Sequence, residues 1–312
     1  MLSLAKKTNS NGVTVEMKFF FIILLLSLST KWAYSWEYCN LKGVYKGHFG
    51  ERLCAPGIEH SFCNPKVRFE GKGIFYSESL APFLPATNKF KRFILETHNY
   101  YRNIVAGGEA TSLAAGSYYP KAGRMRELLW DDELAYGAKL HLTAAKMMDH
   151  DECRSTQRYL LAGQNLGTSS GEYKLTVIEA ITGHLKAMYN EKDLISDTAN
   201  FPDNLTSANV QKAGHFTQMV GDRNSRIGCA YTIGLNCSRL ANNQGPWFPR
   251  CYYLACHYDF SNVSRWRLYK KHATTAGAFC SDWHVGKSKD PRYPNLCEAT
   301  PNELFSYTDK NG

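Results

Sequence analysis

Ten cysteines follow a hydrophobic leader in this chain of 312 residues. The leader begins at Met17 and has Lys18 ahead of an unbroken apolar run, Phe19–Leu26. A small-residue cleavage site, Ala33–Ser35, comes next, so the sequence predicts a signal peptide and a mature chain that starts at Trp36. Because secreted proteins fold in an oxidising compartment, the even number of cysteines predicts a fold held by disulfides, with no obligate free thiol.

The chain divides into four expected parts. Residues 1–35 are the leader, with Met17 as the expected start. Residues 36–87 form a Cys-rich extension without sustained periodicity, 88–262 the main domain, and 263–312 a second Cys-containing extension. The apolar run of the leader is too short to span a bilayer, and no later stretch approaches the roughly 18 apolar residues that a transmembrane helix needs. We therefore expect no transmembrane segment.

Hydrophobic periodicity predicts three helices followed by strands in the main domain. The helices are expected at about 88–106, 131–145 and 176–191. After His215 the period changes to two, which indicates half-buried strands and puts Cys229 and Cys256 on facing strands. Helices and strands in separate runs predict an α+β fold.

Two groups of basic side chains bear on anionic ligands. His98 and Arg102, one turn apart on the first helix, are expected to pack against the sheet, with an anion site as the alternative. Basic residues interleaved with Trp266 and Tyr269 predict a solvated face, with a site for an acidic polysaccharide, lipid headgroup or nucleic acid as the alternative. They are Arg265, Arg267, Lys270, Lys271 and His272. The formal charge of +9 is a modest surplus, and secretion disfavours nucleic acid as a partner.

Five ordered motifs carry a resemblance to a known family. They are His98-Asn99 with Arg102, Leu129–Ala135, His150–Arg154, Gly163–Asn165 and Gly214–Val220. On these residues the chain resembles the CAP superfamily of cysteine-rich secretory, antigen-5 and pathogenesis-related proteins. Tyr293–Cys297, with Cys280 upstream, looks like the C-terminal extension of insect antigen-5-like proteins. The resemblance implies that the α+β fold is a three-layer α-β-α sandwich, the CAP domain, with disulfide-stapled extensions at both ends.

The resemblance also implies a central cleft at His150, Gln164, Glu191 and His215. Two imidazoles and a carboxylate can bind a divalent metal, and we expect His150 and His215 to bind Zn²⁺ weakly. Because Gln164 cannot act as a general base and Glu191 is alone in that role, we expect no catalytic residue and no required cofactor. His257 stands where the family has Asn, and we assign it little chemistry.

A disulfide pattern follows from the resemblance as well. Two cysteines that are usual in the family are missing, one near Gly43 and one at Lys146, and their absence leaves Cys63 and Cys153 to pair with each other. The other expected pairs are Cys39–Cys54, Cys229–Cys256, Cys237–Cys251 and Cys280–Cys297. The last of these encloses a short loop with Trp283, so we expect the C-terminal extension to dock on the core.

Three Asn-x-Ser/Thr sequons occur, at Asn204, Asn236 and Asn262. Such sequons are typical of surface loops in secreted proteins. Asn204 and Asn262 are the expected glycosylation sites, because the sequon of Asn236 contains Cys237.

Three functions are compatible with these features. The favoured one is a secreted, non-enzymatic binding or effector module of the antigen-5 type, directed at an extracellular protein or a lipid or other small ligand. One alternative, which the resemblance also allows, is a carrier of a sterol or another lipid. The other is a metal-dependent hydrolase that uses His150, His215 and Glu191.

Overall fold

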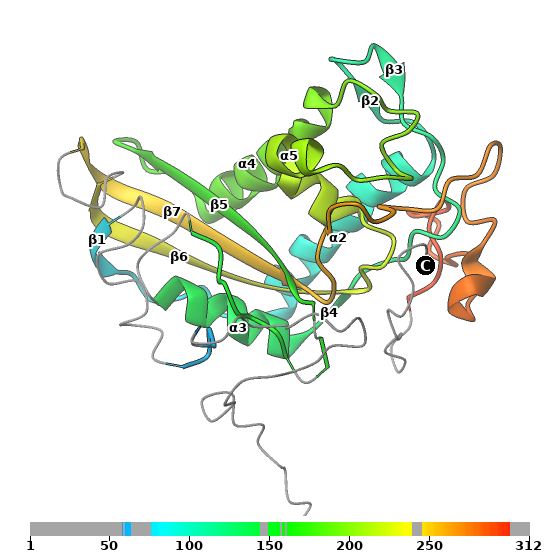
Figure 1. Ribbon diagram of the computed structural model, residues 1–312. Helices are drawn as coiled ribbons and strands as arrows, with labels where there is room; N and C mark the ends of the chain where they lie inside the picture. Colours follow the sequence, from blue (N-terminus) through cyan, green and yellow to red (C-terminus); the bar gives the residue numbers. More distant parts are fainter. Residues whose placement is uncertain are drawn as a thin grey trace, which may run out of the picture. The chain divides into compact units, whose positions relative to one another are not determined.

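The computed structural model describes residues 58, 60–63, 76–143, 149–156, 158–159, 161–238 and 245–299. The leader, Cys39, Cys54 and residues 300–312 lie outside the described residues, so the predictions for them stay predictions. The helices and strands are labelled in Figure 1. They are β1 (Tyr76–Leu80), α2 (Asn88–Ala106), β2 (Thr111–Ser112), β3 (Ser117–Tyr118), β4 (Leu129–Trp130), α3 (Asp132–Thr143), β5 (Gly163–Gly171), α4 (Val177–Asn190), η1 (Glu191–Leu194), α5 (Ser207–Val220), β6 (Arg226–Ser238), β7 (Trp247–Tyr258) and η2 (Cys280–Trp283).

The main sheet places its two longest strands at its centre. Its order is β1-β6-β7-β5 with antiparallel neighbours, and the short β4 pairs with β6 in parallel. Along β7, Leu254 and Cys256 face one core cluster, while Tyr253 and Ala255 face the other. This is the alternation that the sequence predicts. β1 lies inside the predicted N-terminal extension, which therefore contributes a strand to the sheet.

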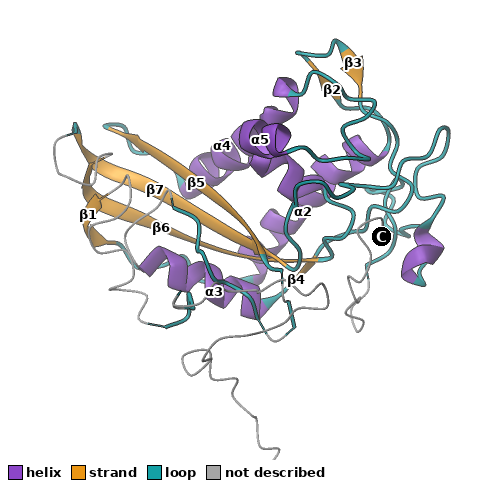
Figure 2. Cartoon of the chain, in the orientation of Figure 1, coloured by secondary structure: helices purple, strands orange, loops and turns teal. Residues whose placement is uncertain are grey.

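Helices cover both faces of the sheet (Figure 2). α3 packs against β6 and β7 on one face, and α2, α4 and α5 bury their apolar sides against the other face in the larger core cluster. The predicted three-layer α-β-α arrangement is thereby confirmed. Among the described helices, none is long and apolar enough to cross a membrane.

The first predicted helix, α2, forms and is capped at both ends. At its start the side chain of Thr87 accepts a hydrogen bond from the Phe90 N–H at 3.3 Å. Ile94 and Val105 lie on its buried face with no exposed surface. The helix ends at Ala106, and Gly107 is its C-cap.

Arg102 ties this helix to three other segments. Its fully buried guanidinium donates to the backbone carbonyls of Arg126, Met219, Gly221 and Asn224 at 2.8–3.2 Å. Burial is the main reason that the pKa of Arg102 falls to about 9, which still leaves it charged at neutral pH. His98 is buried beside it and hydrogen-bonds the Tyr258 hydroxyl at 2.9 Å. Both residues pack inside the protein, so the anion-site alternative is wrong.

A fourth helix, α5, was not predicted, although it carries the Gly214–Val220 motif. Its backbone leaves the helical conformation at Ala213 (φ −138°, ψ 40°), so the apolar period is interrupted and two short pieces adjoin. The first piece is capped by the Thr206 side chain, which accepts from the Asn209 N–H at 3.1 Å. The second piece begins at the motif and needs acceptors from elsewhere in the fold.

Three of the expected disulfides are present. They are Cys229–Cys256, Cys237–Cys251 and Cys280–Cys297. Cys63 and Cys153 are each disulfide-bonded, and the Ser61 N–H donates to the Cys153 carbonyl at 2.7 Å, so their segments lie side by side. The described disulfides do not include a Cys63–Cys153 bridge, which stays a prediction.

The C-terminal extension, as far as residue 299, packs on the core. Cys297 exchanges backbone hydrogen bonds with Met125 and Glu127, at 2.8 and 3.0 Å. Trp283 is 7% exposed, donates its indole N–H to the Arg124 carbonyl at 2.7 Å, and has the Arg126 guanidinium 4.1 Å from its ring centroid. The indole therefore combines apolar burial, a hydrogen bond and cation–π contacts.

Replacement of this indole should destabilise the whole protein. We expect Trp283→Ala to lower the free energy of unfolding by about 3–5 kcal/mol, the usual cost of truncating a buried Trp. Urea denaturation followed by circular dichroism measures the loss. The control is Tyr173→Ala, at a side chain that is 87% exposed, and it should change stability by less than about 0.5 kcal/mol. Equal stability of the two variants would mean that the extension does not support the core.

Candidate functional site

The predicted cleft residues line one cavity of about 410 Å³. All four of them contribute, from the segment before β5, β5 itself, η1 and α5. The lining residues are His150, Arg154, Gln164, Asn165, Glu191, Val210, Gln211, Gly214, His215 and Asn262. Nearly all of these carry polar or charged side chains, so the described walls of the cavity suit a polar ligand.

Glu191 holds His215 in position. One carboxylate oxygen accepts from His215 Nδ1 at 2.6 Å, and the other accepts the backbone N–H groups of His215 and Phe216 at 2.9 and 3.1 Å. These N–H groups belong to the first turn after the break in α5, where no helical acceptor is available. Glu191 therefore caps the second piece of the helix and orients the imidazole that the same piece carries.

Gln164 holds His150 in a similar way, with a neutral amide in place of a carboxylate. Its Oε1 accepts from His150 Nδ1 at 2.8 Å and from the Asp151 N–H at 3.1 Å. Its Nε2 donates to the Asp151 carboxylate at 3.0 Å. Because the Asp151 N–H demands an acceptor and its carboxylate demands a donor, the amide can take only this orientation. His150 must then carry its proton on Nδ1.

Beneath Gln164 lies a buried polar network that the sequence did not reveal. Gln164 Nε2 also donates to His257 Nε2 at 3.0 Å, and the Asp151 carboxylate accepts from His141 Nδ1 at 2.9 Å. His141, Asp151 and His257 are each at most 3% exposed. Gly137 on α3 leaves the room for this, since a Cβ there would meet His257 Nδ1 at 2.9 Å.

His257 was assigned little chemistry, and the structure gives it a structural role as a buried partner of Gln164. It does lie on the strand face opposite Cys256, as the alternation predicts, but this face is closed by α3. The register pairs His257 directly with Gln164, so the two side chains share a face. The signal that could have found it is a titratable residue at an inward position of a strand that is covered on both faces.

Burial shapes the protonation of these histidines. It lowers the pKa of His257 to about 3, despite the opposing effect of Asp151, and keeps the ring a neutral acceptor for Gln164. His150 is exposed as a whole residue, yet desolvation of its ring lowers its pKa. Two smaller effects act on the same pKa: the hydrogen bond with Gln164 raises it, and the charge of Arg154 lowers it. Both rings are therefore neutral near pH 7.

In both cleft imidazoles, Nε2 is the ring nitrogen that stays available for a ligand. In each, Nδ1 donates to an oxygen of its partner, so Nε2 carries a lone pair that can bind a ligand or a metal ion. Gln164 and Glu191 orient the rings through their own oxygens. Within the described residues, no group of three or more His, Cys, Asp or Glu side chains could hold a metal ion. His150 and His215 supply the imidazole groups among the described cleft residues.

Within the C-terminal extension, two of the five basic residues form ion pairs. Lys270 pairs with Asp282 at 2.8 Å and Lys271 with Asp203 at 2.5 Å. Trp266 and Tyr269, which were to interleave with them, are 4% and 0% exposed. The neutralised cations and buried rings favour the expected solvated face.

Acid should destabilise the fold through its buried neutral histidines. Burial lowers the pKa of His98 and His184 to about 4 and of His257 to about 3, against about 6.5 in the unfolded chain. The unfolded state therefore binds more protons, and stability falls as pH drops below about 6.5, by about 1.4 kcal/mol per pH unit for each such histidine. His257→Asn should reduce this slope by about one histidine's share, measured by urea denaturation from pH 7 to 4.5.

A matched control is available at His284. It is exposed and has φ 57°, a left-handed conformation that Asn tolerates, so His284→Asn should keep the wild-type slope. An unchanged slope in His257→Asn would contradict the buried neutral state of His257.

Comparison with known proteins agrees with this fold. The sequence profile of the cysteine-rich secretory protein family, CAP, matches residues 95–258. Venom allergen-1 of Aedes albopictus is 29% identical over 271 residues, 86% of this chain and 93% of the relative. Antigen 5 like allergen Cul n 1 of Culicoides nubeculosus is 34% identical over 209 residues, 67% of this chain and 88% of the relative.

Solved structures share the fold. The crystal structure of NaASP2 with Zn²⁺ aligns with a TM-score of 0.52 at 22% identity and covers 68% of this chain and 96% of that one. The structure of BmVAL-1 aligns with a TM-score of 0.53 at 21% identity and covers 69% and 96%. The matched profile spans the four cleft residues and the strands that position them. The chain belongs to the cysteine-rich secretory protein family, CAP, as an antigen-5-like member.

Proposed function

We propose that this protein is a secreted, non-enzymatic binding module whose cleft takes a polar ligand at the Nε2 atoms of His150 and His215. The observation that carries the proposal is the use of Glu191 and Gln164 as orienting partners. Both hold an imidazole by its Nδ1, and both also accept backbone N–H groups. The described lining of the cleft therefore offers the Nε2 atoms of two oriented imidazoles to a ligand.

We expect a divalent cation to bind these two imidazoles with low affinity. Two imidazoles with hydrogen-bonded Nδ1 atoms match the usual arrangement around zinc, in which a second residue orients each ligand. Catalytic zinc sites use three protein ligands and structural sites use four. With His150 and His215 as the only donors, water must complete the coordination, so the affinity should be low. The related structure of NaASP2 was determined with Zn²⁺.

The hydrolase alternative would rely on Glu191 as its carboxylate base among the described cleft residues. A general base must reach the proton that it abstracts and must be free to accept it. The carboxylate of Glu191 accepts three hydrogen bonds, two of them from backbone N–H groups at the start of a helical turn. Protonation of Glu191 would weaken the cap that holds His215, so catalysis would disturb its own site.

The lipid-carrier alternative finds no support in this cavity. Sterols and acyl chains need concave sites lined mainly by apolar side chains. Among the lining residues that the structure describes, Val210 is the one aliphatic side chain larger than a methyl group. The cavity suits a polar or ionic ligand instead.

Extracellular residence is supported by the covalent structure. Three disulfides lie within the described residues, and stable disulfides persist in oxidising compartments. Relatives of this chain are named venom allergens and antigen 5. The leader at Met17–Ser35 supplies the route to secretion.

Calorimetric titration with Zn²⁺ tests the binding site. We expect weak binding by the wild type and loss of that binding in His150→Ala and in His215→Ala, because each removes one of two ligands. Glu191→Gln should weaken binding by about tenfold or more, the usual effect of losing an orienting partner. The thermal midpoint of each variant shows whether it is folded, and His284→Asn, at an exposed histidine, should bind like the wild type.

Two results would contradict the proposal. Equal affinity in the wild type, His150→Ala, His215→Ala and Glu191→Gln would place the metal outside the cleft. Zinc-dependent turnover of a peptide or ester library that Glu191→Gln abolishes would make the protein a hydrolase.

A further inference from the structure

We propose that Asn204 is the N-glycosylated residue of this protein and that Asn262, a perfect sequon by sequence, stays unmodified because its amide nitrogen builds the wall of the cleft. The sequence treats the two alike, since each begins an Asn-x-Ser/Thr triplet. The structure places them in opposite environments. The proposal requires only that the chain passes through the secretory pathway and holds whether or not the cleft binds a metal.

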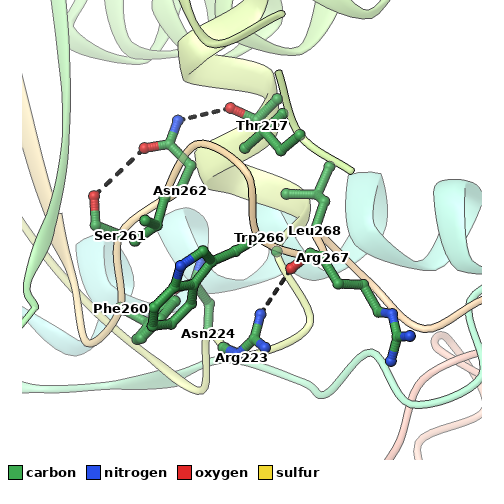
Figure 3. A pocket seen from close by; sticks show the side chains of 12 residues that line it. Thr217, Arg223, Asn224, Phe260, Ser261, Asn262, Trp266, Arg267 and Leu268 are labelled. Atoms are coloured by element: carbon green, nitrogen blue, oxygen red, sulfur yellow. Dashed lines mark hydrogen bonds between the residues drawn. The ribbon is translucent and has the colours of Figure 1, made fainter. Parts of the chain in front are cut away.

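The side-chain nitrogen of Asn262 is already used twice. It donates to the Gly214 carbonyl at 2.8 Å and to the Thr217 hydroxyl at 2.7 Å (Figure 3). The backbone N–H of the same residue donates to the Gln218 side chain at 3.1 Å. Three bonds thus dock Asn262 against α5, at the turn that carries His215.

Asn262 also separates two hollows. It lines the 410 Å³ cleft cavity on one side and a cavity of about 10 Å³, the size of one water, on the other. Figure 3 shows it between Ser261 and Thr217 at the edge of this small cavity. Asn262 is partly buried, and a bulky group on its amide would lie against the lining of these two hollows.

Glycosylation of Asn262 would break this arrangement. In the transfer, the bond between sugar C1 and the pyrophosphate of a lipid-linked oligosaccharide donor breaks, C1 bonds to the amide nitrogen, and one amide proton leaves with the pyrophosphate. The product nitrogen keeps a single hydrogen, so at most one of the bonds to Gly214 and Thr217 survives. The attached sugar would also lie beside His215. We therefore expect a chain modified there to lose part of the contact that docks Asn262 on α5.

Asn236 is also a poor acceptor site. Its side chain donates to Glu78 at 3.0 Å, and the third residue of its sequon, Ser238, is fully buried. The middle residue, Cys237, is bonded to Cys251. The triplet lies in β6, where it pairs with β1 and β7.

Asn204 presents the opposite picture. It is exposed, it lies in the turn before α5, and among the described residues its side chain has no hydrogen-bond partner. Its neighbour Leu205 is 1% exposed and fastens the turn through backbone bonds with Arg265 and Trp266, at 2.6 and 3.0 Å. The backbone is therefore held while the Asn204 amide faces solvent, which leaves room for a glycan.

Glycopeptide mapping of the protein secreted from eukaryotic cells tests the proposal. We expect a glycan on the peptide that contains Asn204 and none on the peptides that contain Asn236 or Asn262. The intact mass should fall by one whole glycan in Asn204→Gln. Enzymatic removal of N-glycans should then change the mass of the wild type and leave that of Asn204→Gln unchanged.

Two variants separate the roles of the Asn262 triplet. Ser264→Ala destroys the sequon but keeps the Asn262 amide, so its mass pattern and melting temperature should match those of the wild type. Asn262→Asp destroys the sequon and the donor together, so it should keep the glycan mass but melt at a lower temperature. A glycan mass lost in Ser264→Ala, a glycopeptide that contains Asn262, or an unmodified Asn204 would each overturn the proposal.

Discussion

The carboxylate of Glu191 joins the chemistry of the cleft to the folding of the helix beside it. One oxygen receives the His215 imidazole and the other receives two backbone N–H groups of the turn that bears it. Because α5 breaks at Ala213, these N–H groups would otherwise lack acceptors inside the protein. Asn262 fastens the same turn from a different segment, through the Gly214 carbonyl and the Thr217 hydroxyl. The position of His215 is thus set by three parts of the chain.

His150 is set by a different device. Gln164 is the centre of a buried hydrogen-bond network, and Asp151 supplies both an N–H and a carboxylate to fix the amide. A carboxylate in place of Gln164 would stand about 3 Å from that of Asp151, at the distance of the present hydrogen bond. The neutral amide is therefore the form that this buried network accepts. The neutral amide also adds no negative charge to the cleft, so a metal cation is held less strongly there than it would be beside a second carboxylate.

Local signals in the sequence predicted much of the fold. The apolar stripe of α2, the alternation in β6 and β7 and the Cys229–Cys256 pair follow from periods of 3.6 and 2, which depend on neighbours within a few residues. The cleft residues came from the resemblance of whole motifs. α5 was not predicted because its apolar period is broken at Ala213. β1 was not predicted because a short edge strand is defined by its pairing with another strand. The role of His257 and the environment of Asn262 were not predicted either, because both depend on burial and on hydrogen bonds with residues far away in the sequence.

Gln164 and Glu191 accept hydrogen bonds from the Nδ1–H groups of His150 and His215, which leaves both Nε2 atoms open to the cleft. Long-range proton–nitrogen correlation NMR of the nitrogen-15-labelled protein at alkaline pH, where imidazoles are neutral, reads this directly. Spectra of His150→Ala and His215→Ala assign the signals. The account predicts that both rings are protonated at Nδ1 with an unprotonated Nε2. A neutral ring protonated at Nε2 in either residue would contradict it.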